Sequence, residues 1–474
     1  MNITAGFPSI RLLNRLAQHN MQEITIVGGG IIGCSTAYWL TRHPNYSPGI
    51  HRITLLEASS TNAGGRTPDS IQDPSTLADP ATVSKRNPAH DGIAGGASGK
   101  AGGLLALWAF PQSLVPLSFR LHDELAREHD GGRRWGYRRC WASQVDCKAR
   151  LPPGIDAGAS VQPPADGGHT GASKGLHKDH KKAAAELRKL GVPGDLDWVD
   201  TADSLRAYDN IGTPDNTAQV HPELFTRSMA QLAEDAGVRI VTGARVTAIN
   251  RSADESQVES VIYEKEGEEI THPTNHCVVA AGPWTRRLLP EIPVSASRAH
   301  SVVIKPPRAI SAYALFTAIK LPVGFRTPVS KTARNGAIKA TPLSGQQVVE
   351  PEIYARPDGT AYACGPTDDA SLPLTTAEVE VDEARCEDII AQVGGISDEL
   401  GRDGEVLARQ ACFLPQGGPY IGQVGSTKGL IVAAGHTCWG IQNAPGTGKL
   451  VSEIILDGEA KSAKLGGCDP ANVL

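Results

Sequence analysis

The alternation of apolar and polar residues is clearest over residues 24–40, near the start of the chain. Residues 24–27 are apolar or β-branched, as a strand buried in a parallel sheet requires. A turn with G-x-G-x-x-G spacing follows, with its glycines at Gly28, Gly30 and Gly33. The apolar residues beyond the turn have the spacing of a helix that packs on a sheet. This pattern predicts a strand, a tight turn and a helix in direct succession.

The rest of the chain repeats these patterns at longer intervals. Helical spacing predicts helices over residues 116–128, 200–208, 221–236, 381–393 and 444–456, the last of them broken by Gly446 and Gly448. Apolar runs predict strands over residues 51–57, 239–241, 244–250, 257–265, 276–282, 301–305, 353–355, 360–364 and 429–436. Strands that alternate with helices indicate an α/β fold, and the strands after residue 300 favour an antiparallel sheet.

The glycine turn has a mechanical interpretation. Gly28 permits the tight turn, Gly30 lets the backbone approach a pyrophosphate, and Gly33 lets the helix lie close to the strand. The helix start offers free N–H groups and a positive dipole end to phosphate. Glu57 ends the next strand 24 residues after Gly33, near the position of an acid that accepts ribose hydroxyls. The alternative is a surface glutamate. Together these features predict a dinucleotide site for FAD or NAD rather than NADP.

Two stretches lack apolar periodicity. Residues 59–95 and 150–180 are rich in small and polar residues, and we expect flexible insertions there. Between them, residues 95–105 are mostly small, and their backbone and the Ser98 hydroxyl could contact a flavin; the alternative is a glycine linker. His169, His177 and His180 lie in the second insertion, where a solvated loop is favoured over a metal site.

Composition sets limits on the class of protein. The 474 residues are 40% hydrophobic and 20% charged with a net charge of −5, which suits two globular domains and gives no basic field for nucleic acid. No apolar run reaches the ~18 residues of a membrane span. Nine cysteines show no zinc spacing, which favours reduced thiols in an intracellular protein. Residues 1–20 contain basic and no acidic residues, which is typical of a weak mitochondrial presequence or of a disordered extension before Met21.

The motifs taken together resemble a known family. They are VGGGIIG at residues 27–33, Glu57, GASGKAGG at 96–103, VAAGPW at 279–284, YARPDG at 354–359 and AGHTCWGI at 434–441. In this order they are similar to the FAD-dependent amine and amino-acid oxidases of the glycine oxidase, sarcosine oxidase and D-amino-acid oxidase superfamily. The GASGKAGGLL run and the inserted loops resemble a fungal branch of uncharacterised oxidoreductases, some of which are assigned to endosomal trafficking.

The resemblance implies a discontinuous architecture. A Rossmann-like FAD-binding domain of the glutathione-reductase type would consist of residues 21–115, 216–299 and 409–460. An α+β substrate domain with an antiparallel sheet would be inserted as residues 116–215 and 300–408. Residues 1–20 and 461–474 would then be tails.

The resemblance also implies site residues. The cofactor-binding set comprises Gly28, Gly30, Ile31, Ile32, Gly33, Glu57, Ala58, Ala97, Ser98, Lys100, Ala101, Gly102, Gly103, Leu104, Val246, Ala281, Gly282, Trp284, Gly435, His436, Trp439, Gly440 and Ile441. The catalytic candidates are Trp108, His300, Tyr354, His436 and Trp439, each with a core or surface role as its alternative. Lys320 and Lys339 are candidates for attracting superoxide, although surface exposure is favoured for both.

Two positions depart from the family pattern. Where the amino-acid enzymes carry an arginine that binds the substrate carboxylate, this chain has Leu414, and Arg409 or Arg356 would have to substitute. Cys364 falls near the position of a flavin-linking cysteine, but a packed strand cysteine is favoured, so FAD is expected to be non-covalent.

The implied activity is that of an FAD-dependent oxidase. It would transfer a hydride from the CH–NH bond of a small amine or amino acid to flavin N5, with O2 as acceptor. One alternative is a flavoenzyme for a larger CH–OH or natural-product substrate. Another is an FAD-binding trafficking or scaffold protein. We expect a cytoplasmic location; mitochondrial or endosomal association, the substrate and the oligomeric state stay open.

Overall fold

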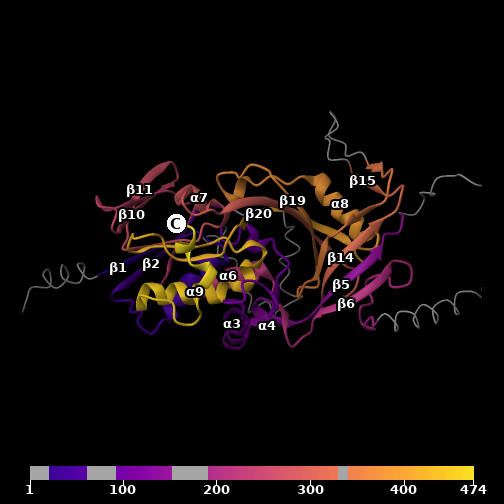
Figure 1. The fold of residues 1–474 in the computed structure, drawn as a ribbon, viewed down its shortest axis with the longest axis horizontal. Coiled ribbons are helices and arrows are strands. Elements are labelled where there is room, and N and C mark those ends of the chain that lie inside the picture. Colours follow the sequence, from indigo (N-terminus) through magenta and orange to yellow (C-terminus); the bar gives the residue numbers. More distant parts are fainter. Residues whose placement is uncertain (1–20, 61–91, 152–190, 329–339) are drawn as a thin grey trace, which may run out of the picture.

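A computed structural model describes residues 21–60, 92–151, 191–328 and 340–474. Two large sheets lie side by side along its longest axis (Figure 1). The first has the strand order β21-β22-β12-β1-β2-β8. Its strands are β1 (Gln22–Val27), β2 (His51–Glu57), β8 (Arg239–Thr242), β12 (His276–Val279), β21 (Tyr420–Gln423) and β22 (Leu430–Ala434). All neighbouring pairs are parallel except β21 with β22.

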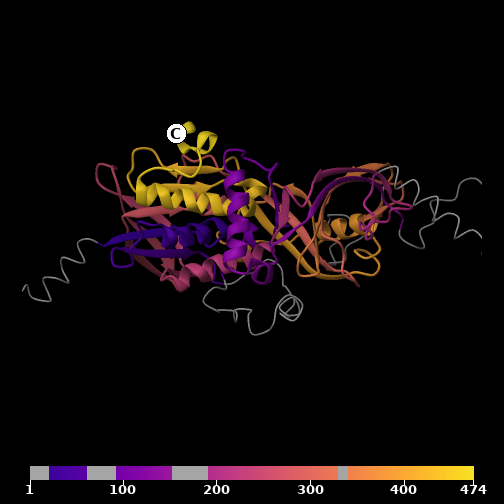
Figure 2. The ribbon, with the colours of Figure 1, turned by 90° about the horizontal axis from the view of Figure 1, so that it is seen from below.

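Both faces of this first sheet are covered, as its apolar strands require. One face packs against α2 (Ile31–Arg42), α6 (Pro222–Asp235) and α9 (Gly440–Asp457), and α3 (Val115–Glu128) crosses α9 in Figure 2. The other face packs against the meander β9 (Arg245–Arg251), β10 (Val258–Lys265) and β11 (Glu268–Pro273). The mixed α/β class expected from the sequence is confirmed.

The second sheet has eight strands and is almost entirely antiparallel. Its order is β20-β13-β19-β18-β14-β5-β6, with β17 paired to β14, and only the pair of β14 with β5 is parallel. The strands are β5 (Trp141–Lys148), β6 (Leu205–Gly212), β13 (Ser295–Lys305), β14 (Tyr313–Leu321), β17 (Gln347–Val349), β18 (Glu352–Ala355), β19 (Ala361–Asp368) and β20 (Glu405–Gln416). Helix α8 (Glu383–Gly394) packs on one face.

The remaining described elements are smaller. They are the three-stranded sheet β3 (Leu104–Ala106), β4 (Arg138–Arg139) and β7 (Thr217–Gln219), the pair β15 (Arg326–Pro328) and β16 (Ala340–Pro342), the helices α4 (Gly131–Arg134) and α7 (Thr285–Leu288), and the 3-10 helices Ala97–Gly99, Gly282–Trp284, Thr376–Glu378, Thr437–Trp439, Gly466–Cys468 and Pro470–Asn472.

Several expectations about local structure are wrong. The helix expected over residues 200–208 is replaced by β6, because residues 205–212 pair along β5. The C-terminal residues 461–474, expected as a tail, include the buried Cys468, and Pro470 lies against β21 at Gly422. The insertion over 59–95 ends inside the protein, since Ile93 is fully buried. Residues 1–20, 61–91 and 152–190, with most of both insertions, lie outside the described residues.

Helix α9 runs without a break, contrary to the sequence prediction. Its glycines are sites of close packing: a Cβ at Gly446 would lie 2.3 Å from the Ser118 hydroxyl of α3, and one at Gly448 would lie 2.7 Å from the backbone of Ser35 in α2. A larger residue at either position would therefore push neighbouring helices apart.

The same helix contains a proline, whose ring removes one backbone donor. Pro445 cannot donate to the carbonyl of Ile441, four residues earlier. That carbonyl lies 3.0 Å from Nε2 of His122 on α3, which replaces the missing donor. Burial lowers the pKa of His122 to about 4, so the ring is neutral at pH 7 and donates from this nitrogen.

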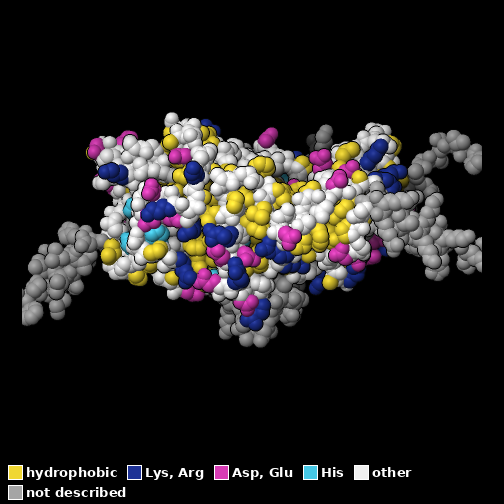
Figure 3. All heavy atoms as spheres, turned by 60° about the horizontal axis from the view of Figure 1, so that its bottom comes forward, with side chains coloured by type: hydrophobic (Ala, Val, Ile, Leu, Met, Phe, Trp, Pro, Cys, Tyr) yellow, Lys and Arg dark blue, Asp and Glu magenta, His cyan; other side chains and the backbone are white. Residues whose placement is uncertain are grey.

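Neither sign of charge dominates the face of the molecule drawn in Figure 3. On the face drawn in Figure 3, basic and acidic side chains are interspersed between apolar ones. Among the described helices, none is both long enough and apolar enough to cross a membrane.

A buried polar contact joins the helical layer to the second sheet. His221, at the start of α6, lies with Nε2 3.3 Å from the carboxylate of Asp358, in the turn between β18 and β19. Its Nδ1 accepts a hydrogen bond from the Leu224 N–H at 3.4 Å. Burial would raise the pKa of Asp358, but the hydrogen bond from His221, with Arg356 nearby, holds this pKa well below its ordinary value.

We therefore predict that Asp358→Asn lowers the free energy of unfolding at pH 7 by about 1–3 kcal/mol. Because the folded-state pKa is depressed, this stability is present above the ordinary aspartate pKa of about 3.9 and is lost as the pH falls below it. Urea unfolding at a series of pH values measures the difference. Asp369→Asn, at an exposed position directly after β19, is the control. Equal stability of the Asp358 variant and wild type at pH 7 would contradict the prediction.

Candidate active site

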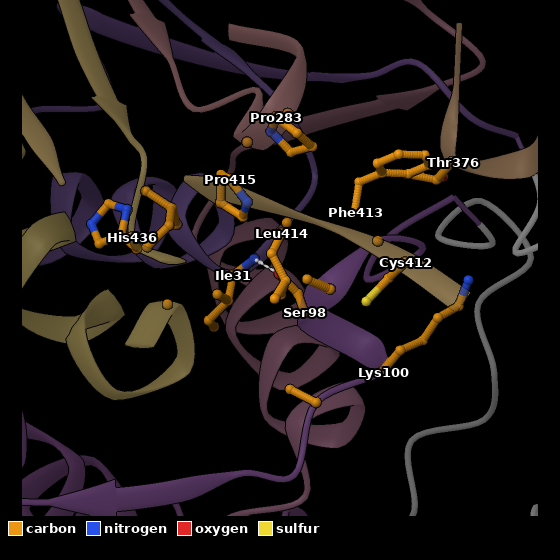
Figure 4. A pocket seen from close by; sticks show the side chains of 18 of the residues that line it. Ile31, Ser98, Lys100, Pro283, Thr376, Cys412, Phe413, Leu414, Pro415 and His436 are labelled. Atoms are coloured by element: carbon orange, nitrogen blue, oxygen red, sulfur yellow. Dashed lines mark hydrogen bonds between the residues drawn. The ribbon is translucent and has the colours of Figure 1, made fainter. Parts of the chain in front are cut away.

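A cavity of about 560 Å³ lies between the two sheets. The parallel strands β1, β2, β12 and β22 open onto it at their carboxyl ends, where ligands bind in open α/β sheets. The second sheet closes it from the opposite side through β13, β14, β18, β19 and β20. In Figure 4, Leu414 and Pro415 of β20 lie near Ile31 and Ser98, and Cys412 lies toward Lys100.

The glycine turn is held by close backbone contacts. Gly28 has φ +117°, and a Cβ there would lie 2.4 Å from the carbonyl oxygen of Ala280. A Cβ at Gly33 would lie 2.0 Å from the carbonyl oxygen of Gly28. These contacts agree with the tight turn and close helix packing that the spacing predicts. Gly33 itself does not line the cavity, so its role is in the packing of α2.

The start of α2 lines the cavity without a side-chain cap of its own. Gly30 occupies the N-cap position, and the Ile31 N–H donates to the Ser98 hydroxyl at 2.9 Å (Figure 4). The positive end of the helix dipole therefore lies at the cavity wall, where it favours an anion.

Glu57 lies at the cavity with most of its surface buried. Its carboxylate accepts hydrogen bonds from the backbone N–H groups of Gly29 at 2.7 Å and Ser59 at 2.9 Å. Burial raises the pKa of Glu57, while these backbone hydrogen bonds act in the opposite direction. Each oxygen keeps a second lone pair, so the carboxylate can still accept hydroxyl groups from a ligand.

The loop of small residues passes directly under the second sheet. A Cβ at Gly102 would lie 2.5 Å from the ring of Tyr354, so only glycine fits here. The Lys100 ammonium donates to the carbonyl oxygen of Ala411 in β20 at 3.1 Å. Burial lowers the pKa of Lys100. The loop expected to lie along a cofactor is thus ordered, and the linker alternative is wrong.

The segment between β22 and α9 forms another wall. Nε2 of His436 lies 2.9 Å from the Thr447 hydroxyl, and burial lowers the pKa of His436 to about 3. The ring is therefore neutral at physiological pH. The ring of Trp439 packs edge to face on Trp108 with centroids 5.8 Å apart. Among the described residues, no group of three or more potential metal ligands is found.

The second sheet presents two rows of side chains to the cavity. Cross-strand pairing places Phe316, Glu352 and Cys364 in one row, on β14, β18 and β19. Tyr354 and Tyr362 form the next row, two residues along the strands, where side chains share a face. The Tyr354 hydroxyl donates to Glu352 Oε2. Burial raises the pKa of Glu352, with the Tyr354 hydrogen bond opposing it.

The structure brings nearly all of the expected cofactor-binding residues to this one cavity. Apart from Gly33, every member of that set lines it, from Gly28 to Ile441. Of the catalytic candidates, Tyr354, His436 and Trp439 line it as well. Their location agrees with the expectation, and their roles stay predictions.

Two catalytic candidates lie elsewhere. His300 is almost fully buried, and its Nε2 accepts the backbone N–H of Asp382 at 3.0 Å, before α8, so it serves in packing of the second sheet. Trp108 is not in the cavity wall; it packs behind Phe316 and Trp439.

The described basic residues that were proposed as substitutes or oxygen-attracting groups do not line the cavity either. Arg409 donates a hydrogen bond to the Glu387 carboxylate. Arg356 donates to the Ala101 carbonyl oxygen, and its guanidinium lies over the Tyr362 ring. Neither arginine lines the cavity. Lys320 is exposed on β14, and Lys339 lies outside the described residues. Leu414 does line the cavity, so this wall is apolar where an arginine was expected.

Sequence reasoning missed several residues of the wall. The most informative are Phe316 and Glu352, and the others include Arg245, Arg287, Tyr362, Thr376, Cys412, Phe413, Pro415 and Cys438. Glu352 immediately precedes the apolar stretch Ile353-Tyr354-Ala355. Alternate residues of a strand share a face, so Glu352 lies on the same face of β18 as Tyr354. This alternation could have identified Glu352, because Tyr354 was already a candidate.

A parallel sheet that opens onto a long cavity through a glycine turn defines a dinucleotide-binding protein of the α/β class. A family model described as FAD dependent oxidoreductase matches residues 89–454. The Saccharomyces cerevisiae protein TDA3 is 30% identical, with 95% of this chain and 94% of TDA3 covered. The Schizosaccharomyces pombe protein C1F5.03c is 32% identical, with 96% and 99% covered. Both relatives are provisionally named as oxidoreductases.

The chain belongs to this family of FAD-dependent oxidoreductases. Among solved structures, glycine oxidase from Geobacillus kaustophilus has a similar fold, with a TM-score of 0.60 at 17% identity. The similarity covers 95% of this chain and 98% of the glycine oxidase chain.

The cavity fits FAD in its shape and its donors. The uncapped start of α2 and the glycine turn would hold the pyrophosphate, and Glu57 would accept the ribose hydroxyls. The Gly95–Gly103 loop lines the cavity mostly with glycine and other small residues, which allow the close approach that a flat ring system needs.

We predict that Gly33→Ala destabilises the protein by about 1–3 kcal/mol or more, because its methyl group would overlap the Gly28 carbonyl oxygen. In a helix without this contact, replacing glycine by alanine would raise the stability by up to about 1 kcal/mol. A loss of stability in the variant would therefore show that the methyl group overlaps the carbonyl oxygen. Chemical denaturation and the FAD content of the purified variant measure it. Gly194→Ala, with no atom within 4 Å of its Cβ, is the control and should change little. A stabilised Gly33 variant with full FAD content would disprove this account.

Proposed function

We propose that this protein is an FAD-dependent amine oxidase that removes a hydride from a carbon bearing an amine nitrogen. The observation that carries the proposal is one continuous cavity, lined at one end by the glycine turn and at the other by aromatic side chains of the second sheet. The structurally similar glycine oxidase supports the same class of reaction.

The protein's part in this reaction is binding and orientation. FAD supplies the hydride acceptor. The wall formed by Phe316, Tyr354, Tyr362 and Trp439 excludes water and positions the substrate C–H bond. Loss of the hydride leaves an iminium, which water hydrolyses to a carbonyl compound and an amine, and O2 takes the electrons as hydrogen peroxide.

A base with strong proton affinity is not required for the C–H step, because the carbon loses a hydride rather than a proton. The amine must be unprotonated when the hydride leaves. The pKa of His436 is lowered to about 3, so this histidine is a poor proton acceptor at pH 7. We therefore assign His436 to holding the loop before α9 rather than to proton transfer.

The proposal predicts a yellow protein whose isoalloxazine absorbance bleaches when an amine is added without oxygen. A library of primary and secondary amines, amino acids and alcohols should be titrated anaerobically into the purified holoprotein. Admitting O2 should restore the colour and produce peroxide. Bleaching by alcohols alone would favour a CH–OH reaction. Flavin that no substrate reduces would contradict an oxidase and favour a scaffold function.

We also predict that acid precipitation releases the flavin, because Cys364 does not form a covalent link. Burial and the nearby Glu352 raise the pKa of the Cys364 thiol, which stays protonated and a weak nucleophile. The supernatant should contain free FAD in wild type and in Cys364→Ser alike. Flavin that stays with the wild-type precipitate and is released from the variant would show a covalent bond.

A further inference from the structure

The end of the cavity beside β18 carries an acidic side chain. Glu352 lines this end on β18, with Phe316 and Cys364 beside it on the neighbouring strands. Within the described residues, Glu352 forms no ion pair within 4.0 Å with any lysine, arginine or histidine. A carboxylate taken out of water without a cation is costly, so a charged partner would be bound strongly.

The hydrogen bonds to this carboxylate leave room for a ligand. The Tyr354 hydroxyl donates to Oε2, and the Cys364 thiol lies 4.0 Å from the same oxygen. Among the described residues, Oε1 has no hydrogen-bond partner, and it is not enclosed away from solvent. It can therefore accept a hydrogen bond from a molecule in the cavity.

The side chains around Glu352 suit a cation. The Phe316 and Tyr354 rings pack edge to face at 6.3 Å, and the Tyr354 and Tyr362 rings lie 5.9 Å apart. Aromatic rings attract ammonium groups through their negative faces. On β20, the apolar Leu414 offers no donor to a substrate carboxylate.

We propose that the substrate carries a second positive charge, which Glu352 binds, so that the enzyme prefers diamines to amino acids of the same length. This inference rests on the proposed function, which assigns this end of the cavity to substrate. Glu352 is then a specificity-determining residue. One ammonium is fixed at the carboxylate and the aromatic wall, and the other amine is left for oxidation.

The test compares two ligands of equal length. Butane-1,4-diamine and 4-aminobutanoate differ only in the charge at the far end of the chain. Isothermal titration of the chemically reduced holoenzyme, under anaerobic conditions so that neither ligand can be oxidised, should give a Kd for the diamine that is lower by on the order of 10-fold to 100-fold. Tighter binding of 4-aminobutanoate by wild type would overturn the inference without any variant.

Glu352→Gln keeps the shape of the side chain and removes its charge. The variant should bind the diamine on the order of 10-fold to 100-fold more weakly and lose the discrimination between the two ligands. Glu350→Gln, at an exposed position two residues earlier, is the matched control and should behave as wild type. Diamine affinity that is unchanged in Glu352→Gln would overturn the assignment.

Failure of this inference is distinguishable from failure of the proposed function. Calorimetry needs no turnover, so Glu352-dependent diamine binding without flavin reduction would reject amine oxidation but keep the cation site. Flavin reduction by amino acids, with equal rates in Glu352→Gln, would keep the oxidase and reject the site. If Glu352→Gln does not fold, Glu352→Asp keeps the charge and should retain the preference for the diamine.

Discussion

The structure depends on the approach of three backbone segments at the end of β1. Gly28 lies against the carbonyl of Ala280, and Gly33 lies against the carbonyl of Gly28, so the strand, the turn and α2 pack without side chains between them. This contact fixes where the helix begins. Because the helix begins at the cavity wall, its first N–H groups and the positive end of its dipole face the cavity. The strand ends beside the helix supply Glu57 and Ala281 to the same wall.

The cavity has a different electrostatic character at its two ends. At the first sheet, backbone donors and a helix start favour the phosphates of a dinucleotide. At the second sheet, the described wall is mostly aromatic and apolar, and its carboxylate is that of Glu352. Each end is provided by a different sheet, so the same cofactor-binding half can serve other substrates when residues such as Leu414 and Glu352 differ.

Helix α9 shows how tertiary packing can overrule local rules. Its proline and glycines would weaken an isolated helix. In the protein, the glycines admit α2 and α3 at short distance, and His122 donates to the carbonyl that Pro445 leaves without a partner. The cost to the helix is offset by burial that a helix of larger residues could not reach.

How far the sequence predicts this protein depends on the range of the interactions involved. The first strand, turn and helix and the acid at Glu57 follow from local spacing, because the glycine motif has a fixed geometry. The other residues expected around the cofactor followed from the resemblance of their motifs to a known family. The strand over residues 205–212 and the unbroken α9 could not be read in this way, since their partners β5, α2 and α3 are distant in sequence.

The chain by itself thus determined the parallel sheet, its glycine turn and the place where a cofactor is expected. Only the tertiary structure decided which side chains complete the cavity. It removed His300, Arg356 and Arg409 from the wall, and it set Glu352 between Phe316 and Cys364. The physical reason is that cross-strand register, which no single segment encodes, selects the residues that meet across a sheet.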